Sequence, residues 1–335
     1  MEVSIIIPTR NRNLILIETL NSIAKTDAKL INNIEVILVN DGDDELSIPK
    51  TIIDQLNIII IKSNSKGAAF ARNMGAQSSK GKLLLFLDDD ILIPEDNIIK
   101  HLKVHDTYVN SIVSGIWKYS DEVLRMFQKT SFGKYKVKHD YKSHDGTNGI
   151  EISTGIFKVQ SLASFNLSIS RSVFFDIKGF NEEFLYAGCE DQEFTGRALN
   201  AGYNLLLDTN NISFHNEKDR IHIEKWLARQ YTGVQGFVLL AELFPQRKQT
   251  AMYCENTPIY CKDSLRLKSK KTAKYLLSRT GITWLIIKFT LIGEKLYVPN
   301  FLLFKMYNLL AGIYLYKGFM KSYRNLGLKI DAKKI

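Results

Sequence analysis

Three consecutive carboxylates, Asp88, Asp89 and Asp90, follow an apolar run at residues 83–87. A short apolar run of this kind is typical of a buried strand. Adjacent anions resist burial unless they face a solvated cleft or a cation. Carboxylate oxygens suit Mg²⁺ and Mn²⁺, which commonly carry substrate phosphates. The triplet therefore predicts a cation site or, as the alternative, an acidic turn before the helix that follows Pro94.

A second pair of carboxylates, Glu190 and Asp191, opens a predicted helix that ends near Asn200. Acidic residues stabilise the positive end of a helix dipole, so capping is one interpretation of this pair. The other is general-base catalysis, in which a carboxylate beside a cleft takes a proton from a nucleophilic hydroxyl. His215 follows a short apolar strand, where it could be a metal ligand or a structural histidine.

The elements that must position these residues alternate between strands and helices, which predicts a mostly parallel α/β sheet. The predicted strands and helices, in chain order, are 3–7, 14–24, 34–39, 58–61, 68–77 and 83–87. Such sheets bind ligands beyond the carboxyl ends of their strands. Thr9, Arg10 and Asp41 follow strand ends, as the triplet does. This recurrence predicts one binding edge.

Two of these residues have specific chemistry available to them. Asp41 could accept an N–H of a nucleotide base, or it could be a turn residue before Gly42. Arg72, on the predicted helix 68–77, could pair with a phosphate or with an aspartate, or lie on the surface.

The remainder of the first 219 residues is less regular. Strands are predicted at 111–117, 162–169, 205–207 and 212–214, and a helix at 121–132. The polar, basic segment 133–149 predicts a long loop, a common form of binding loop or lid.

Several classes of protein lose support from the sequence. No GxGxxG follows the first strand and there is no P-loop, which argues against dinucleotide oxidoreductases and P-loop phosphotransferases. Three widely spaced cysteines indicate free thiols in a reducing compartment. The N-terminus does not have the pattern of a signal peptide, and no apolar stretch reaches the roughly 20 residues of a spanning helix.

Charge is divided unevenly along the chain. Residues 220–335 carry 21 Lys and Arg against 6 Asp and Glu, a net charge of +15, whereas residues 1–219 have a net charge of −5. Helices are predicted at 226–243, 264–277, 284–296 and 301–323, and the last two mix aromatic, aliphatic and Lys residues. This pattern favours an anionic membrane surface or a helical subdomain packed on the core. No nucleic-acid-binding motif occurs, so we expect no nucleic-acid partner.

Six segments together carry a resemblance to a known family. They are SIIIPTRNR at 4–12, VNDG at 39–42, KGAAFARNMG at 66–75, LFLDDD at 85–90, GFNEEF at 179–184 and GCEDQEF at 188–194. In this order and spacing they resemble the family 2 glycosyltransferases of GT-A fold, over about residues 1–219. The resemblance implies a metal-dependent, inverting transfer of a hexosyl or N-acetylhexosaminyl group from a nucleotide sugar, expected to be a UDP-sugar, to an acceptor hydroxyl.

The resemblance also implies roles for individual residues. Pro8 and Thr9 match the opening nucleotide loop, with Arg10 beside them, and Asp41 matches the aspartate that binds the base. Arg72 matches the arginine of the helix after the third strand, and Asp88 and Asp89 are assigned to the donor. Asp90, with Asp88 and His215, is assigned to a bound Mn²⁺ or Mg²⁺. Asp191 matches the catalytic base, with Glu190 beside it.

The resemblance suggests a catalytic domain at 1–219, with a nucleotide-binding half at 1–110 and an acceptor half at 111–219, and a basic helical region at 220–335. The expected acceptor is a glycan, a lipid-linked molecule or a peptide, in the synthesis of surface polysaccharides or glycoconjugates. The expected location is the cytoplasm, with peripheral contact at the inner face of the membrane. The alternatives are a sugar-phosphate nucleotidyltransferase and a non-catalytic sugar-nucleotide-binding protein.

Overall fold

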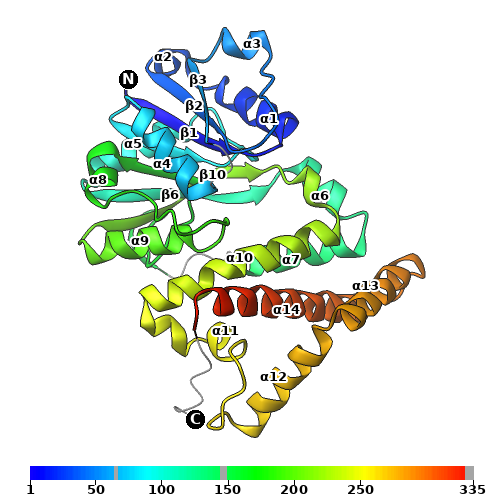
Figure 1. The fold of residues 1–335 in the computed structure, drawn as a ribbon. Coiled ribbons are helices and arrows are strands. Elements are labelled where there is room, and N and C mark those ends of the chain that lie inside the picture. Colours follow the sequence, from blue (N-terminus) through cyan, green and yellow to red (C-terminus); the bar gives the residue numbers. More distant parts are fainter. Residues whose placement is uncertain (64–66, 144–148, 329–335) are drawn as a thin grey trace. The chain divides into compact units, whose positions relative to one another are not determined.

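The computed structural model describes residues 1–63, 67–143 and 149–328 of the chain (Figure 1). Contacts within the chain divide it into two compact units. The first unit contains Met1–Val123, Asp145–Leu185 and Glu190–Glu217, and the second contains Leu124–His144, Tyr186–Cys189 and Lys218–Ile335. The second unit therefore takes a segment, Leu124–His144, that the sequence assigns to the acceptor half.

The first unit is built on one mixed sheet. Among the described residues its strands run in the order β3-β2-β1-β4-β9-β6-β10-β8-β7, with β5 paired to β10. Their bounds are β1 Val3–Thr9, β2 Ile34–Asn40, β3 Ile58–Lys62, β4 Leu83–Leu87, β5 Ile91–Leu92, β6 Ser111–Tyr119, β7 Ile150–Ser153, β8 Ile156–Lys158, β9 Asn166–Ser170 and β10 Asn204–His215. Strands β3, β2, β1 and β4 are parallel, as the alternating pattern predicts. Beyond β4 the sheet changes, because β9 is antiparallel to both of its neighbours.

Helices cover both faces of this sheet. Since successive side chains on a strand point to opposite faces, Ile6 packs on one side of β1 while Ile5 and Ile7 pack on the other. The face with Ile5 and Ile7 is covered by α1 (Asn13–Ile23), α3 (Lys50–Ile53) and α5 (Asn97–Thr107). The opposite face is covered by α4 (Ala68–Ser78), α8 (Arg171–Asp176) and α9 (Glu190–Asn200). The short α2 (Ala28–Ile31) precedes β2.

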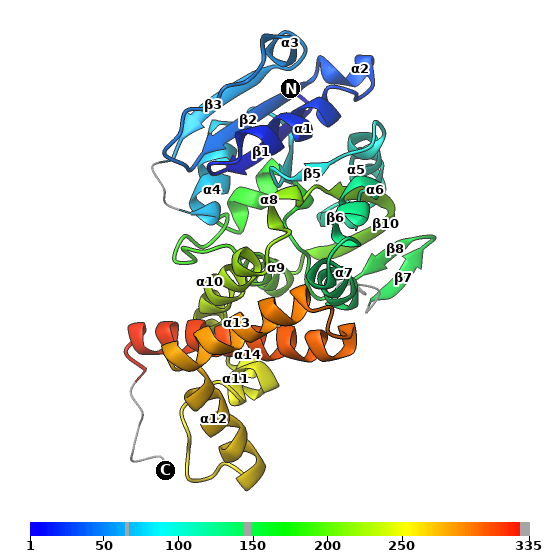
Figure 2. The ribbon, with the colours of Figure 1, turned by 90° about the vertical axis from the view of Figure 1, so that its right-hand side faces the viewer.

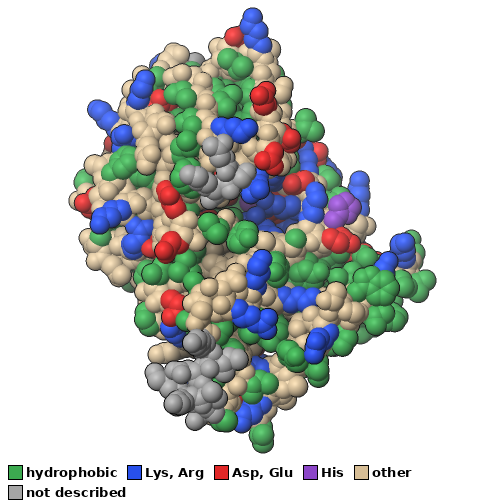
Figure 3. Space-filling view, in the orientation of Figure 1, with side chains coloured by type: hydrophobic (Ala, Val, Ile, Leu, Met, Phe, Trp, Pro, Cys, Tyr) green, Lys and Arg blue, Asp and Glu red, His purple; other side chains and the backbone are tan. Residues whose placement is uncertain are grey.

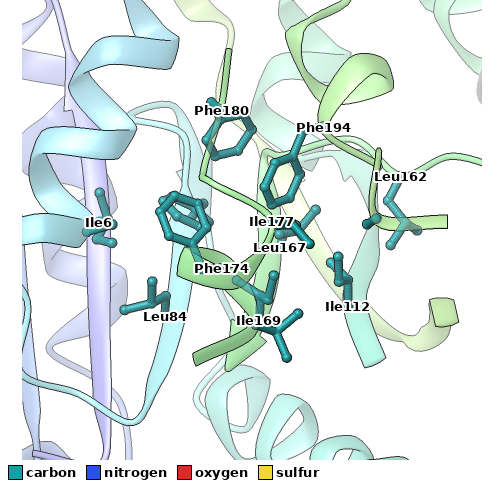
Figure 4. Close-up of a cluster of buried hydrophobic side chains, with 14 of the residues drawn as sticks. Ile6, Leu84, Ile112, Leu162, Leu167, Ile169, Phe174, Ile177, Phe180 and Phe194 are labelled. Carbon is teal, nitrogen blue, oxygen red and sulfur yellow. The ribbon is translucent and has the colours of Figure 1, made fainter. Parts of the chain in front are cut away.

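Aromatic rings fasten α8 and α9 to the sheet. Phe180 and Phe194 stack with their ring centroids 4.3 Å apart, and Phe174 lies 5.2 Å from Phe86 of β4 (Figure 4). Phe194 belongs to the first turns of α9, so this packing fixes the start of the helix that carries Glu190 and Asp191.

Two sequence predictions were wrong in detail. The predicted strands 205–207 and 212–214 form a single strand, β10, whose pairing with β6 shifts register between Asp208 and Ile212. Two polar residues, Asn210 and Asn211, make that irregularity look like a turn in the sequence. The predicted loop at 133–149 is largely helical, because α7 spans Ser131–Ser143; its remainder at 144–148 lies outside the described residues.

The second unit is helical. Besides α7 it contains η1 (Lys218–Arg220), α10 (Ile223–Leu243), η2 (Pro245–Gln249), α11 (Ala251–Cys254), α12 (Leu265–Leu277), α13 (Thr280–Lys295) and α14 (Asn300–Asn325), while α6 (Asp121–Phe127) has residues in both units. Helices α10 and α14 lie side by side (Figures 1 and 2). Trp226 and Leu227 of α10 pack with Tyr307 and Leu310 of α14. Within the described residues no individual helix is long and apolar enough to cross a membrane; α12 and α13 satisfy that criterion only as a pair, bent by 83°.

Candidate active site

The carboxyl ends of three parallel strands bring the first set of polar residues together. Thr9 at the end of β1 is paired with Asn40 at the end of β2, and the next residue, Asp41, donates its backbone N–H to the carbonyl of Thr9 at 2.8 Å. On the other side of β1, the parallel strand β4 ends immediately before Asp88. Thr9, Asp41 and the aspartate triplet therefore lie at one edge of the sheet, and their role in binding stays a prediction.

A guanidinium group lies between two members of the triplet. Arg12, in the loop after β1, donates from Nη1 to Asp89 Oδ1 at 2.6 Å and from Nη2 to Asp90 Oδ2 at 2.8 Å. Thr9 donates to the other oxygen of Asp89 at 2.7 Å. Burial raises the pKa of Asp89 to about 7, against the opposing effect of Arg12. Arg12 thus places one positive charge between these two aspartates.

The third aspartate belongs to a group of potential metal ligands. Strand β5, directly after the triplet, pairs antiparallel with the end of β10 and places His215 opposite Ile91. This pairing brings His215 and Glu217 to Asp90, so that one ligand atom from each lies within 4.8 Å of the others. Nδ1 of His215 is 3.9 Å from Asp90 Oδ2 and 3.7 Å from Glu217 Oε1.

The environment of His215 suits a cation. Its Nδ1 is buried and, among the described residues, makes no hydrogen bond. Trp117 and Tyr119 of β6 hold the imidazole from the side, with the Trp117 ring centroid at 5.2 Å, and the Tyr119 hydroxyl donates to Glu217 at 3.2 Å. Two carboxylates and an imidazole are a donor set that Mn²⁺ accepts readily, and Mg²⁺ is also compatible with the oxygens. The residues present therefore fit a divalent ion.

A second cluster forms around Arg72. This buried guanidinium, on α4, donates to Asp88 Oδ1 at 2.9 Å and to Glu190 Oε1 at 3.1 Å, and it lies over the ring of Phe180. The two carboxylates raise the pKa of Arg72, although burial opposes them. Arg72 therefore ties the strand-end triplet to the start of α9.

Asp191 lies beside this cluster. Its Oδ1 accepts the backbone N–H of Gln192 at 2.7 Å. Burial, followed by the charge of Glu190, raises the pKa of Asp191 to about 7. A carboxylate with a pKa near neutrality has the proton affinity that a general base needs. The chain reaches this position through Gly188 and Cys189, whose φ angles are 134° and 78°. The positive φ at Cys189 is costly for a non-glycine residue, and such strain is often found at functional sites.

Asp41 directly follows β2, on the side of β1 opposite to β4. Its carboxylate is buried and accepts a hydrogen bond from the Ser63 hydroxyl and one from the Gly67 N–H at 3.1 Å. Arg10 is exposed, and its Nη1 is 4.0 Å from Asp41 Oδ2. These contacts hold one carboxylate in a fixed orientation at the end of β2.

The predicted site residues therefore fall into neighbouring groups on one edge. Pro8, Thr9, Arg10 and Asp41 lie at the ends of β1 and β2, and Arg72 joins Asp88 to Glu190. Asp90 and His215 belong to the potential metal group, whereas Asp88 contacts Arg72, and its assignment to the metal stays a prediction.

The sequence prediction missed Arg12 and Glu217 as site residues. For Glu217 the available signal was its position two residues after His215, on a segment that continues from a strand.

Solved structures resemble this chain in fold. The mannosyltransferase PcManGT from Pyrobaculum calidifontis, described in complex with GDP-Man and Mn²⁺, matches with a TM-score of 0.58 at 16% identity, covering 96% of this chain and 88% of that one. The first 349 residues of TarS from Staphylococcus aureus match with a TM-score of 0.50 at 17% identity, covering 97% and 92%. The protein has the GT-A fold, as predicted. Residues 4–167 match the model of glycosyl transferase family 2. This match confirms the predicted resemblance to family 2 glycosyltransferases over that segment.

Curated relatives share only part of the chain. An uncharacterised glycosyltransferase of Bacillus subtilis, YfnE, is 32% identical over 123 residues, which are 35% of this chain and 31% of YfnE. TarS of S. aureus, named as a poly(ribitol-phosphate) beta-N-acetylglucosaminyltransferase, is 32% identical over 102 residues, 29% of this chain and 18% of TarS. The chain spans less than half the length of these relatives.

Proposed function

We propose that the protein is a metal-dependent glycosyltransferase that moves a sugar from a nucleotide-sugar donor to an acceptor hydroxyl with inversion at the anomeric carbon. The observation that carries the proposal is the connection of two groups through the aspartate triplet. One group, Asp90 with His215 and Glu217, fits a divalent cation. The other contains Asp191, a carboxylate with a pKa near 7, beside the Arg72 cluster.

Each group has a distinct task in this reaction. Asp41, fixed by Ser63 and Gly67, binds an N–H of the base. Asp90, His215 and Glu217 would hold Mn²⁺ or Mg²⁺, which when bound neutralises the charge that develops on the leaving diphosphate. Asp191 accepts the proton of the acceptor hydroxyl as that oxygen attacks the anomeric carbon. The sugar is transferred, the nucleoside diphosphate leaves, and the proton remains on Asp191 until it is released to solvent.

Arg72 positions the reacting groups. Because it bonds Asp88 and Glu190 at once, it fixes the distance between the strand edge and α9. It also lowers the pKa of Asp191, which burial raises, and so helps to keep that carboxyl ionisable near neutral pH.

The donor is proposed as a UDP-hexose or UDP-N-acetylhexosamine, and the acceptor as a glycan, a lipid-linked molecule or a peptide used in surface polysaccharide or glycoconjugate synthesis. The relative TarS is named for transfer of N-acetylglucosamine to poly(ribitol-phosphate), which supports including polyol-phosphate polymers among the acceptors tested. GDP-mannose is a necessary comparison, since PcManGT is described with GDP-Man. The cytoplasmic location expected from the sequence stays a prediction.

The test is a panel of UDP- and GDP-sugars with Mn²⁺, in which thermal stabilisation and slow donor hydrolysis are measured together. We expect one donor to stabilise the protein and to release a nucleoside diphosphate. Asp191→Asn should retain the stabilisation and lose the hydrolysis. Release of pyrophosphate from a sugar phosphate and a nucleoside triphosphate would indicate a nucleotidyltransferase instead, and binding without any turnover would indicate a non-catalytic protein.

A further inference from the structure

Helix α13, in the second unit, carries an exposed apolar stripe on its outward face. Ile282, Leu285, Phe289, Ile292 and Leu296, which directly follows the helix, are separated by three, four, three and four residues and so share one side. Their exposed fractions run from 40% at Ile282 to 71% at Leu296. A stripe this apolar is normally buried in a soluble protein.

The opposite side of α13 is already packed. Ile286, Ile287 and Leu291 contact the apolar cluster around Leu303 and Tyr307 of α14. A side chain at Gly293 would come within 3.2 Å of Leu303, so α13 approaches α14 closely there. Because the core-facing side of α13 is already packed, the exposed stripe is a second apolar face, and it has no partner among the described residues.

Aromatic side chains enlarge this face. Trp284 is 56% exposed, and Tyr297 and Phe301, at the turn into α14, are 93% and 63% exposed. We call these three residues and the stripe the α13 surface. Figure 3 shows the hydrophobic side chains gathered over α13 with Lys and Arg among them. Large contiguous apolar patches with polar rims mark interaction sites.

The charged residues of the helices that carry the α13 surface are predominantly basic. Residues 264–325 contain twelve Lys and Arg and a single acidic residue, Glu294, whose carboxylate accepts a hydrogen bond from the Tyr307 hydroxyl. Lys288 extends over the Trp284 ring, 5.5 Å from its centroid, and Lys295 of α13 and Lys305 of α14 are exposed. An occupant of this surface must therefore be apolar in its interior and negatively charged at its rim.

This requirement decides between a second copy of the chain and a lipid surface. Three-four spacing also makes coiled-coil seams, but those pair Lys with Glu on their flanks. Two α13 surfaces facing each other would instead oppose Lys288, Lys295 and Lys305 without acidic partners. The acyl region of a bilayer takes apolar side chains, anionic headgroups take the lysines, and Trp and Tyr favour the boundary between them.

We propose that the α13 surface binds the face of a bilayer that contains anionic lipids, with α13 lying in the plane of the interface. The 16 residues of α13 span roughly 24 Å, which is shorter than the hydrocarbon core of about 30 Å. The helix is therefore too short to cross the bilayer, but it can lie parallel to the surface. Such binding concentrates the protein where lipid-linked acceptors occur. It does not depend on the proposed transfer reaction.

The test is flotation of the purified full-length chain with phosphatidylcholine vesicles that contain or lack phosphatidylglycerol, at low and at high salt. We expect flotation only with phosphatidylglycerol, and weaker flotation at high salt. The double variant Phe289→Glu/Leu296→Glu should not float. Replacing Lys288 or Lys295 with Gln should lower partitioning about fivefold each.

The matched control is Val109→Glu, which changes an exposed apolar residue of the first unit (74% exposed) to the same acidic residue. It should float like the wild type, and all variants should keep the wild-type melting temperature. Failure of the wild type to float with anionic vesicles would overturn the proposal, as would equal flotation of the double variant. A concentration-dependent dimer that Phe289→Glu/Leu296→Glu abolishes, without vesicle binding, would assign the surface to a second copy. None of these results depends on turnover, so the proposed function is tested separately.

Discussion

Arg12 offers the sharpest quantitative test of the site, because it is hydrogen-bonded to the carboxylate of Asp90, which a metal ion would also bind. Its two hydrogen bonds, at 2.6 and 2.8 Å, hold one positive charge against Asp89 and Asp90, which are almost fully buried. A divalent ion held by Asp90, His215 and Glu217 must share or displace the contact from Arg12 Nη2. We therefore expect Arg12 to weaken metal binding in the absence of a donor.

The expected magnitudes follow from the geometry. Replacing Arg12 with Met removes a guanidinium from two adjacent buried carboxylates, and loss of one partner of a buried ion pair typically costs about 3–5 kcal/mol of unfolding free energy. Protonation of Asp89, whose pKa of about 7 rises further without Arg12, should reduce that cost in acidic buffer. A charge-assisted hydrogen bond is worth about 1.5–3 kcal/mol, so relief of competition should tighten Mn²⁺ binding roughly tenfold to a hundredfold.

The assay is calorimetric titration of Mn²⁺ into the donor-free protein, paired with thermal unfolding at increasing Mn²⁺. Arg12→Met should unfold at a lower temperature without metal, and should recover more stability than the wild type when Mn²⁺ is added. A concentration of about one hundred times Kd contributes about 2.7 kcal/mol. Arg12→Lys, which keeps the charge but not the two-pronged contact, should fall between them. Equal or weaker Mn²⁺ affinity in Arg12→Met would refute the competition.

Three further predictions concern the same edge of the sheet. The raised pKa of Asp191 means that kcat/KM should increase as the pH rises through about 7. It also means that the native state binds more protons than the unfolded state between about pH 4 and 7, so the unfolding free energy should fall as the pH rises over that range. Asp191→Asn should make this fall shallower in a pH series of denaturant titrations, and an unchanged slope would contradict the assignment. His215→Ala should weaken Mn²⁺ binding by at least about tenfold in calorimetry. His139→Ala, which changes a half-buried histidine of the second unit outside the metal group, should not, and equal losses would count against the metal group. Ser63→Ala removes a hydroxyl that orients Asp41 and should weaken donor binding roughly fivefold with kcat little changed, and a normal donor Kd would show that Asp41 does not need this contact.

The parts of the site that the sequence predicts well are those set by local pattern. Each parallel strand is a short apolar run, and the polar residue after it must emerge at the same edge as its neighbours. Thr9, Asp41 and Asp88 follow this rule, and their relative positions could be inferred without coordinates. The role predicted for Asp191 depends on the resemblance to family 2 glycosyltransferases, which rests on the order of six segments from 4–12 to 188–194.

The parts that the sequence does not predict depend on contacts between distant segments. Arg12 reads as one of several polar loop residues, and only the fold shows that its guanidinium spans Asp89 and Asp90. Glu217 lies near Asp90 because β5 pairs with the end of β10, and β5, a strand of two residues, is too short to be predicted from periodicity. The sequence pattern predicts a loop where α7 lies, because most residues of this helix are basic or polar and only a few, such as Phe132 and Tyr135, are apolar and pack in the second unit.

The pairing of β5 with β10 has a consequence for how the protein matures. Asp90 is made early during synthesis, whereas His215 and Glu217 are made more than a hundred residues later, after the family-matched segment 4–167 has ended. A nascent chain that has exposed only that segment holds the aspartate triplet and Arg12 but neither of the other two potential ligands. Arg12 can then serve as an internal counter-ion that keeps Asp89 and Asp90 tolerable until β10 is in place. Capacity for a divalent ion would thus be the last property of the first unit to emerge on the ribosome.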